Sequence, residues 1–247
     1  MRQPRRSRVW ARRRLDAGAG WYRGWVSAFA IDVDGPTLVA KMAGGENRLG
    51  SHMLVAWNGL LDIAEANQAV SSLVVIGDDR YWSTGLDLDE IQSLDDVGAH
   101  SFMRRVDLLL GRILTAPLIT IAALNGHTYA AGALLALAFD YRVMREDRGF
   151  FCLPSVDVGI PFSPGMSALI AAKLPQPIAH DLVVSCRRIG GLEASDAGVV
   201  HRSVDGSSVL HVAQKMALDY SGKDPATLTT VKRRMYPEAA GMLTPQG

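Results

Sequence analysis

Apolar residues recur along this chain with two different periods, and the alternation of these periods predicts an α/β protein. Positions 72–77 and 118–126 are nearly unbroken apolar runs, a pattern typical of strands buried on both faces. Positions 51–66 instead repeat apolar residues every three or four positions, which predicts a helix. Two alternating runs around Asp34-Gly35 predict a hairpin. Further helices are expected at about 130–139, 165–174, 178–186, 192–197, 207–220 and 225–235, and further strands at 141–145 and near 150–152. Strands and helices thus alternate over the first two thirds, and the last third is expected to be helical.

Composition restricts the classes of protein to which the chain can belong. Of its 247 residues 48% are hydrophobic and 21% charged, and its formal net charge is +1, as in ordinary globular proteins. The length suits one domain, or one domain with a small appendage. No apolar run approaches the roughly 18 residues of a membrane span, and the near-zero charge argues against a dedicated nucleic-acid binder. Cys152 and Cys186 form neither a disulfide framework nor a metal-ligand cluster, so we expect no metal and a reducing, cytoplasmic location.

Positive charge is concentrated at the start of the chain. Residues 1–25 hold eight arginines and one acid and carry +7, whereas the other 222 residues hold 18 basic and 24 acidic groups and carry −6. The stretch lacks the apolar run of a secretory signal; a mitochondrial transit peptide is one alternative, and a mis-assigned start is another. We favour a later start, for example at Val26, because the strand pattern begins only at about Ser27. The expected division is a leader over 1–25, an α/β core over 26–190 and a helical region over 191–247.

Two turns from a strand into a helix could hold an anionic or polarised oxygen. The first spans 82–88, where Gly85 permits a positive φ or a close backbone approach and Asp87 can cap the next helix. The second spans 126–133 and opens an Ala-rich helix. Free N–H groups at such junctions can converge on one carbonyl oxygen, as in an oxyanion hole made of main chain. The simpler alternatives are a capped turn and a tightly packed core helix.

A third segment, residues 153–162, is punctuated by proline and glycine and carries Ser155 and Asp157. Either side chain could act in a site, although Asp157 could equally satisfy local backbone amides. His127 and Tyr129 lie near the same expected pocket, where packing or hydrogen-bonding roles are the simpler interpretation. A hydrolytic triad of Ser155, His127 and Asp157 finds no support in the spacing.

At these segments the sequence resembles the enoyl-CoA hydratase/isomerase (crotonase) superfamily. Residues 84–88 (TGLDL) resemble the family's oxyanion turn A-G-A-D-L, and 126–132 (GHTYAAG) resemble its second turn, G-x-x-x-G-G-G. Residues 139–145 (FDYRVMR) are similar to the C-D-x-R-x-x strand that follows. Residues 46–49 (ENRL) and 223–228 (KDPATL) are similar to the Δ3,Δ2-enoyl-CoA isomerase branch.

The resemblance implies a crotonase-like spiral of ββα units with a C-terminal helical region that trimerises, as a homotrimer or a dimer of trimers. It implies an acyl-CoA thioester as ligand, with coenzyme A carried by the substrate and no other cofactor. By position, the backbone N–H groups of Leu86 and Ala131 would form the oxyanion hole, and the carbonyl of Thr84 would lie near the adenine. The residues expected to contact coenzyme A are Arg48, Thr84, Gly85 and Gly132.

Two departures from the family pattern bear on the reaction. Hydratases carry a glutamate in the helix after the glycine turn, where this chain has Leu134, so the isomerase branch fits better. Isomerases keep a glutamate in a loop P-E-V-D-L-G-I-P, where this chain has Ser155. A serine hydroxyl is too weak a base to replace it, and losing a general base costs about 10²–10⁴-fold in rate.

Three functions follow from these departures. The first is isomerisation of 3-enoyl-CoA in fatty-acid metabolism, with Asp157 or an acid elsewhere in the chain as the base. The second is acyl-CoA binding without catalysis, because the base was lost at Ser155. The third is another reaction through an enolate, such as thioester hydrolysis.

Overall fold

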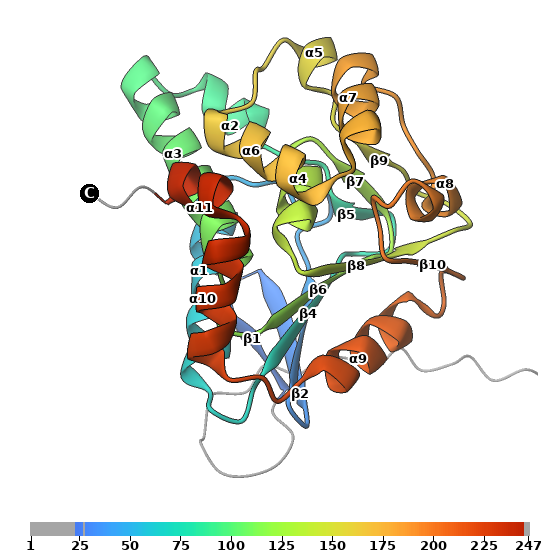
Figure 1. The fold of residues 1–247 in the computed structure, drawn as a ribbon. Coiled ribbons are helices and arrows are strands. Elements are labelled where there is room, and N and C mark those ends of the chain that lie inside the picture. Colours follow the sequence, from blue (N-terminus) through green and yellow to red (C-terminus); the bar gives the residue numbers. More distant parts are fainter. Residues whose placement is uncertain (1–22, 27, 245–247) are drawn as a thin grey trace, which may run out of the picture.

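Two sheets organise the chain. The computed structural model describes residues 23–26 and 28–244, in which a seven-stranded sheet has the order β1-β2-β3-β4-β6-β8-β10 and a three-stranded sheet the order β5-β7-β9 (Figure 1). The strands are β1 (Arg23–Val26), β2 (Phe29–Asp34), β3 (Thr37–Met42), β4 (Ser72–Ile76), β5 (Tyr81–Ser83), β6 (Ile119–Leu124), β7 (His127–Tyr129), β8 (Tyr141–Arg145), β9 (Phe151–Cys152) and β10 (Arg202–Val204). The helices are α1 (Ser51–Ala66), α2 (Leu88–Gln92), α3 (Asp96–Leu114), α4 (Ala131–Ala138), α5 (Ser155–Val158), α6 (Pro164–Lys173), α7 (Gln176–Ser185), α8 (Gly191–Asp196), α9 (Val209–Tyr220), α10 (Pro225–Met235) and α11 (Pro237–Leu243).

A strand–strand–helix unit repeats three times. β4, β6 and β8 lie side by side in the large sheet, and each is followed by one strand of the small sheet and then by helix. Neighbouring strands of successive units run parallel in both sheets, as they must when each unit returns the chain in the same direction. The expected spiral of ββα units is therefore confirmed, and it places the ends of β5, β7 and β9 next to one another.

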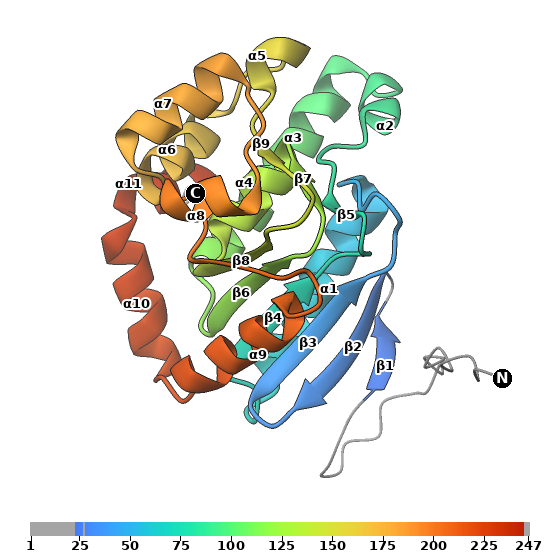
Figure 2. The ribbon, with the colours of Figure 1, turned by 90° about the vertical axis from the view of Figure 1, so that its right-hand side faces the viewer.

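The large sheet is covered on both faces, which explains the unbroken apolar runs of its central strands. On one face, Leu73 and Val75 of β4 join the main core with α1, α3 and α4. On the other face, Val74 packs with Ile121 of β6 and with Ala213 of α9 (Figure 2). Burial on both faces is the arrangement that parallel strands require.

The ends of the chain differ from the sequence-based division. β10 lies inside the region expected to be helical and pairs in parallel with β8, and α9 covers the sheet, so 191–247 shares the core. β10 was not predictable from the apolar pattern, because it has three residues and no buried side chain. β1 pairs with β2 in antiparallel register, so strand structure begins before Ser27. Residues 1–22 of the expected leader lie outside the described residues.

Candidate active site

The turn after β5 and the turn after β7 pack directly against each other. Gly85 has φ +98°, and a Cβ atom there would lie 3.0 Å from the nitrogen of Ala131 and 2.8 Å from Cβ of Ala130. A Cβ on Gly132 would lie 2.6 Å from the carbonyl oxygen of Ser83. Glycine is needed at both positions because a side chain would separate the two turns.

Each turn presents one backbone N–H group that has no acceptor among the described residues. The backbone of Leu49 forms hydrogen bonds with the residues on both sides of Leu86. Its N–H donates to the Gly85 carbonyl at 2.7 Å, and its carbonyl accepts from the Asp87 N–H at 3.2 Å. This pairing leaves the Leu86 N–H unused. Ala131 is the first residue of α4, where helix geometry supplies no acceptor for its N–H. Two free donors at adjoining turns can stabilise charge on one carbonyl oxygen.

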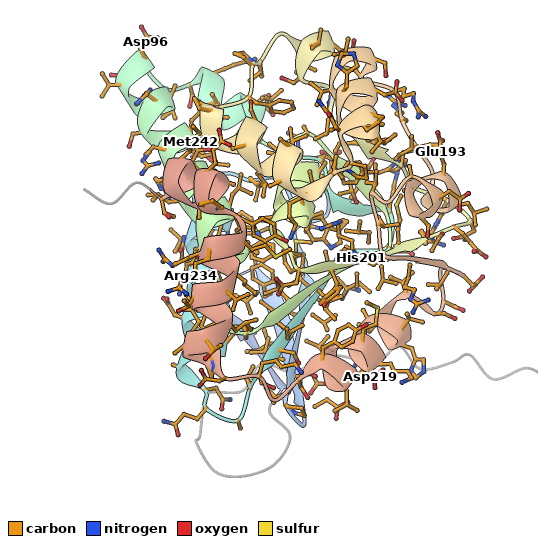
Figure 3. The ribbon with its side chains drawn as sticks, viewed as in Figure 1. Asp96, Glu193, His201, Asp219, Arg234 and Met242 are labelled. Carbon is orange, nitrogen blue, oxygen red and sulfur yellow. The ribbon has the colours of Figure 1, made fainter. Side chains whose placement is uncertain are left out.

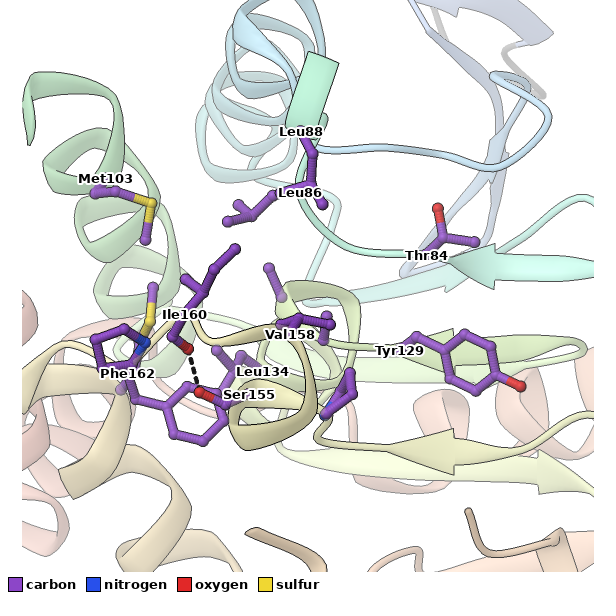
Figure 4. Close-up of a pocket in the computed structure, with 15 residues that line it drawn as sticks. Thr84, Leu86, Leu88, Met103, Tyr129, Leu134, Ser155, Val158, Ile160 and Phe162 are labelled. Atoms are coloured by element: carbon purple, nitrogen blue, oxygen red, sulfur yellow. Dashed lines mark hydrogen bonds between the residues drawn. The ribbon is translucent and has the colours of Figure 1, made fainter. Parts of the chain in front are cut away.

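Both donor residues line a cavity of about 220 Å³ (Figure 4). Its walls are largely apolar, and the described side chains that line it include no carboxylate, imidazole, amine, guanidinium or thiol. The lining residues are Thr84, Leu86, Leu88, Met103, Tyr129, Ala130, Ala131, Leu134, Pro154, Ser155, Val158, Ile160, Pro161, Phe162 and Met166. In such surroundings a hydrogen bond to developing charge is stronger than in water.

Ser155 and Asp157 lie on the same short helix but face different surroundings. Ser155 is buried and lines the cavity, and its hydroxyl donates to the carbonyl of Ile160, whose N–H donates back to the Ser155 carbonyl at 3.1 Å. The hydroxyl therefore closes the loop 155–160. Asp157 is exposed and is not among the lining residues, so the structure does not bring this carboxylate into the cavity.

Residues 45–246 match a family model described as enoyl-CoA hydratase/isomerase. The chain belongs to the enoyl-CoA hydratase/isomerase family. It is 32% identical over 208 residues to a protein of Arabidopsis thaliana named enoyl-CoA delta isomerase 3, covering 80% of this chain and 87% of that protein. It is 32% identical over 220 residues to enoyl-CoA delta isomerase 2, peroxisomal, of the same plant, covering 83% and 90%. The crystal structure of an enoyl-CoA hydratase from Mycobacterium ulcerans is similar with a TM-score of 0.81 and 25% identity, covering 87% of this chain and 94% of that one.

The other residues that the family resemblance singled out fall into two groups. Thr84 lines the cavity beside the two donors, whereas Gly85 and Gly132 lie where the two turns touch. Arg48 lies outside this cavity, in a wider depression. Its guanidinium is paired with Glu46 at 2.7 Å and with Asp89 at 3.1 Å, so carboxylates surround the charge that was expected to meet coenzyme A.

His127 and Tyr129 form a ring cluster that leads away from the cavity. The Tyr129 hydroxyl lies 2.8 Å from Nδ1 of His127, and its ring points outward in Figure 4. Burial lowers the pKa of His127, and the nearby Arg80 lowers it further. Because the Ser155 hydroxyl is bonded to Ile160 rather than to this imidazole, no hydrolytic triad is assembled.

Sequence reasoning missed one buried acid behind the cavity wall. Asp107 lies on α3 one turn after Met103, and its Oδ1 accepts a hydrogen bond of 2.8 Å from Ser163. Burial raises the pKa of Asp107. The apolar spacing of the helix gave no signal for it, because Asp107 lies next to Val106 at the edge of the apolar stripe.

The described part of the chain holds neither a membrane-spanning helix nor a cluster of metal ligands. None of its helices is long and apolar enough to cross a membrane. Within the same residues, no group of three or more His, Cys, Asp or Glu side chains is placed to hold a metal ion.

Proposed function

We propose that this chain binds acyl-CoA thioesters and holds the thioester carbonyl oxygen between the N–H groups of Leu86 and Ala131. The observation that carries the proposal is the pair of free backbone donors at the wall of an apolar cavity. These donors would stabilise the negative charge that gathers on the oxygen when a C2 proton leaves and an enolate forms. Coenzyme A would enter only as part of the substrate.

In this proposal, isomerisation of 3-enoyl-CoA is slow because none of the described side chains that line the cavity can act as a general base. Moving the double bond from C3 to C2 requires removal of a C2 proton and return of a proton at C4. Ser155 stands where the family's glutamate is expected, and its hydroxyl proton is committed to the Ile160 carbonyl. Loss of a positioned general base lowers the rate by about 10²–10⁴-fold.

The second candidate is a full 3-enoyl-CoA isomerase that uses Asp157 as its base. The relatives named enoyl-CoA delta isomerase favour it. It requires α5 to turn, because the exposed Asp157 carboxylate would have to replace Ser155 at the cavity wall. α5 has only four residues and is capped by Gly159, which has φ +69°, but such a turn would break the two hydrogen bonds that Ser155 and Ile160 exchange.

One set of variants separates the two candidates. We would measure binding of a saturated acyl-CoA by calorimetry, and conversion of a 3-enoyl-CoA by the ultraviolet absorbance of the conjugated thioester. The proteins are the wild type, Ser155→Glu, Ser155→Gln and Asp157→Asn. Ser155→Gln is the matched control, because it has the size of glutamate without its basicity.

The proposed function predicts that wild type and Ser155→Gln bind the thioester with little turnover, and that Ser155→Glu gains about 10²-fold or more in rate. Fast turnover by wild type that Asp157→Asn abolishes would establish the second candidate instead. Failure of all four proteins to bind any acyl-CoA would overturn both.

Assembly and location remain predictions of the same proposal. The homotrimer or dimer of trimers is checked by light scattering of the purified protein. The cytoplasmic location is checked by fractionation of the native cells. Of the two plant relatives described above, one is named as peroxisomal.

A further inference from the structure

The two ends of the cavity differ in polarity. Thr84 and Tyr129 lie at one end, and Met103 and Phe162 lie at the other (Figure 4). Leu86, which carries one of the two oxyanion donors, lies between them. A thioester carbonyl bound there would direct its acyl chain toward the apolar end that holds Met103 and Phe162. The buried Met166 lines the same cavity and lies four residues after Phe162 in the chain.

Polar groups lie directly behind this apolar end. Asp107 follows Met103 by one turn of α3, and it accepts the hydrogen bond from Ser163, the residue after Phe162. The Ser163 hydroxyl in turn accepts from the N–H of Met166 at 3.1 Å. These hydrogen bonds join α3, which carries Met103, to the start of α6, which follows Phe162 and carries Met166, and so they tether the segments of all three wall residues. A longer chain that displaced them would press methylene groups against a buried carboxylate, which is unfavourable.

The volume of the cavity sets a scale for the acyl chain. An apolar cavity of about 150 Å³ holds benzene, which has six carbon atoms. By proportion, a cavity of about 220 Å³ holds roughly nine carbon atoms, the thioester carbonyl included. Leu88, Val158 and Ile160 line the side of the cavity and are partly exposed, so a chain that left between them would return to water and gain no further burial.

We propose that the cavity selects medium-chain acyl groups, of roughly six to ten carbons, and that Met103 and Met166 set the upper limit. The inference rests on the proposed acyl-CoA binding and adds the substrate class. Below the limit each added methylene is buried, so affinity should rise about threefold to fourfold per carbon. Above the limit the gain should stop.

The test is a series of saturated acyl-CoA thioesters from butanoyl to tetradecanoyl, each titrated by calorimetry into the full-length protein. Wild type is expected to bind more tightly with each step up to eight or ten carbons and then to level off, as the volume estimate requires. Met103→Ala and Met166→Ala are each expected to move the break upward by about two carbons. In each variant the dodecanoyl thioester should gain about tenfold over the octanoyl thioester, relative to wild type.

Two controls keep the outcome interpretable. Met103→Leu preserves the volume of the wall and should leave the break in place, whereas Met235→Ala removes an exposed methionine on α10, outside the cavity, and should change nothing. Met166 is almost fully buried, so Met166→Ala could unfold the chain; the half-buried Met103 then carries the test alone.

The outcomes separate this inference from the function on which it rests. Wild-type affinity that rises without a break to fourteen carbons overturns the inference but leaves acyl-CoA binding intact. A break that stays in place in both alanine variants overturns the assignment of the two methionines. Absence of binding at every chain length overturns the proposed function itself.

Discussion

Two regions of the molecule differ in their content of charged side chains: the cavity, and the packed region between the C-terminal helices and the sheet, which we call the C-terminal seam. No described side chain that lines the cavity is charged at neutral pH. The C-terminal seam, by contrast, gathers ionisable groups between α6, α10 and the sheet, and we define it as Asp140, Arg142, Lys173, His201, Lys232 and Tyr236. Of these residues, His201 is labelled in Figure 3. Buried ionisable side chains, which are often expected in an active site, thus lie here between the C-terminal helices and the sheet.

Hydrogen bonds to backbone carbonyls hold most of the seam. The Lys232 ammonium donates to the Ala116 and Leu118 carbonyls at 3.0 and 2.9 Å and to the Asp140 carboxylate at 2.7 Å. The fully buried Arg142 donates to two further backbone carbonyls. Burial lowers the pKa of Arg142 to about 10. The bonds of Lys232 attach α10 to the residues just before β6 and β8.

In this protein, displaced pKa values gather in a hydrogen-bonded network away from the cavity. Displaced pKa values often mark active sites, but structural ion networks displace them as well. Burial lowers the pKa of Lys173 to about 7 and that of His201 to about 4, and neither residue lines the cavity. The site that we propose works instead through main-chain N–H groups, which do not lose their protons near neutral pH.

Removing the seam's ammonium should have the largest effect on stability. Lys232→Met removes the ammonium that donates to two carbonyls and neutralises the Asp140 carboxylate, which keeps only the hydrogen bonds from Thr120. Breaking a buried pair on one side costs about 3–5 kcal/mol. Urea denaturation measures this loss, and Lys215→Met, which removes an exposed lysine paired with Asp219, is the control. A loss below 1 kcal/mol, or a change in acyl-CoA affinity at temperatures where the variant is folded, would contradict the separation of seam and site.

Closing the contact between the two turns should have the largest effect on the site. Gly85→Ala places a methyl group 3.0 Å from the nitrogen of Ala131, which moves one oxyanion donor away from the other. Loss of one such donor costs about 10²–10³-fold in rate, so we expect the rate of Ser155→Glu on a 3-enoyl-CoA to fall by about that factor when Gly85→Ala is added. Affinity for a saturated acyl-CoA, whose carbonyl oxygen carries no full charge, should fall by about threefold to tenfold.

Gly35→Ala is the matched control, because Gly35 also has a positive φ, +57°, but a methyl group there has no neighbour within 4 Å. It should lower stability slightly and leave affinity unchanged. Equal losses of affinity in the two variants would mean that Gly85 matters for backbone strain alone.

The pH dependence of stability should expose Lys173. Its ammonium lies 4.8 Å from the centre of the Tyr236 ring, and burial together with the nearby charge of Arg142 lowers its pKa from 10.5 to about 7. Between these values the unfolded chain binds more protons than the folded chain, so stability should rise from pH 7 toward pH 10. Lys173→Met should flatten this rise and stabilise the protein at pH 8 by on the order of 1–2 kcal/mol.

Lys215→Met, at an exposed position, should leave the pH profile as it is in wild type. Asp140 on the chain after α4 and Lys232 on α10 also face Lys173 with opposite effects on its pKa. A profile of Lys173→Met that runs parallel to that of wild type would show that the ammonium is fully solvated.

The sequence predicted the fold well, and it located the two glycine turns that the structure packs against each other, because both depend on patterns of adjacent residues. The apolar runs located β4 and β6, and the glycine turns after β5 and β7 located the two free donors. These features need only spacing and the absence of a side chain.

The acid chemistry was less predictable, because it depends on the direction in which single side chains point. Nearness in sequence to Ser155 suggests Asp157 as the base. Residues two positions apart on a helix point to different faces, however, and the Asp157 carboxylate is exposed. Asp107 lies behind the cavity wall on α3, 56 residues before its partner Ser163, and no local pattern connects the two residues. The same holds for Met103 and Met166, which meet only in the folded chain.

The smallest expected effect concerns the strain at the turn into α4. Ala130 has φ 51° and ψ −125°, a conformation that residues other than glycine rarely adopt, and the resemblance places a family glycine at this position. Its N–H donates to the Cys152 carbonyl at 3.0 Å, which fixes the peptide that presents the Ala131 N–H to the cavity. Ala130→Gly relieves about 1–3 kcal/mol of strain but adds about 0.5–1 kcal/mol of chain entropy on unfolding, so stability should rise by roughly 1 kcal/mol.

Ala133→Gly, inside the helical part of α4, should instead lower stability by about 1 kcal/mol, and denaturation in urea distinguishes the two signs. Acyl-CoA affinity should not change in Ala130→Gly, because the bond to Cys152 and the free N–H of Ala131 are both retained. If affinity fell although stability rose, the strained backbone at Ala130 would itself help to position the N–H group that binds the thioester. Backbone strain would then hold the cavity wall in place, as buried ion pairs and hydrogen bonds hold the C-terminal seam.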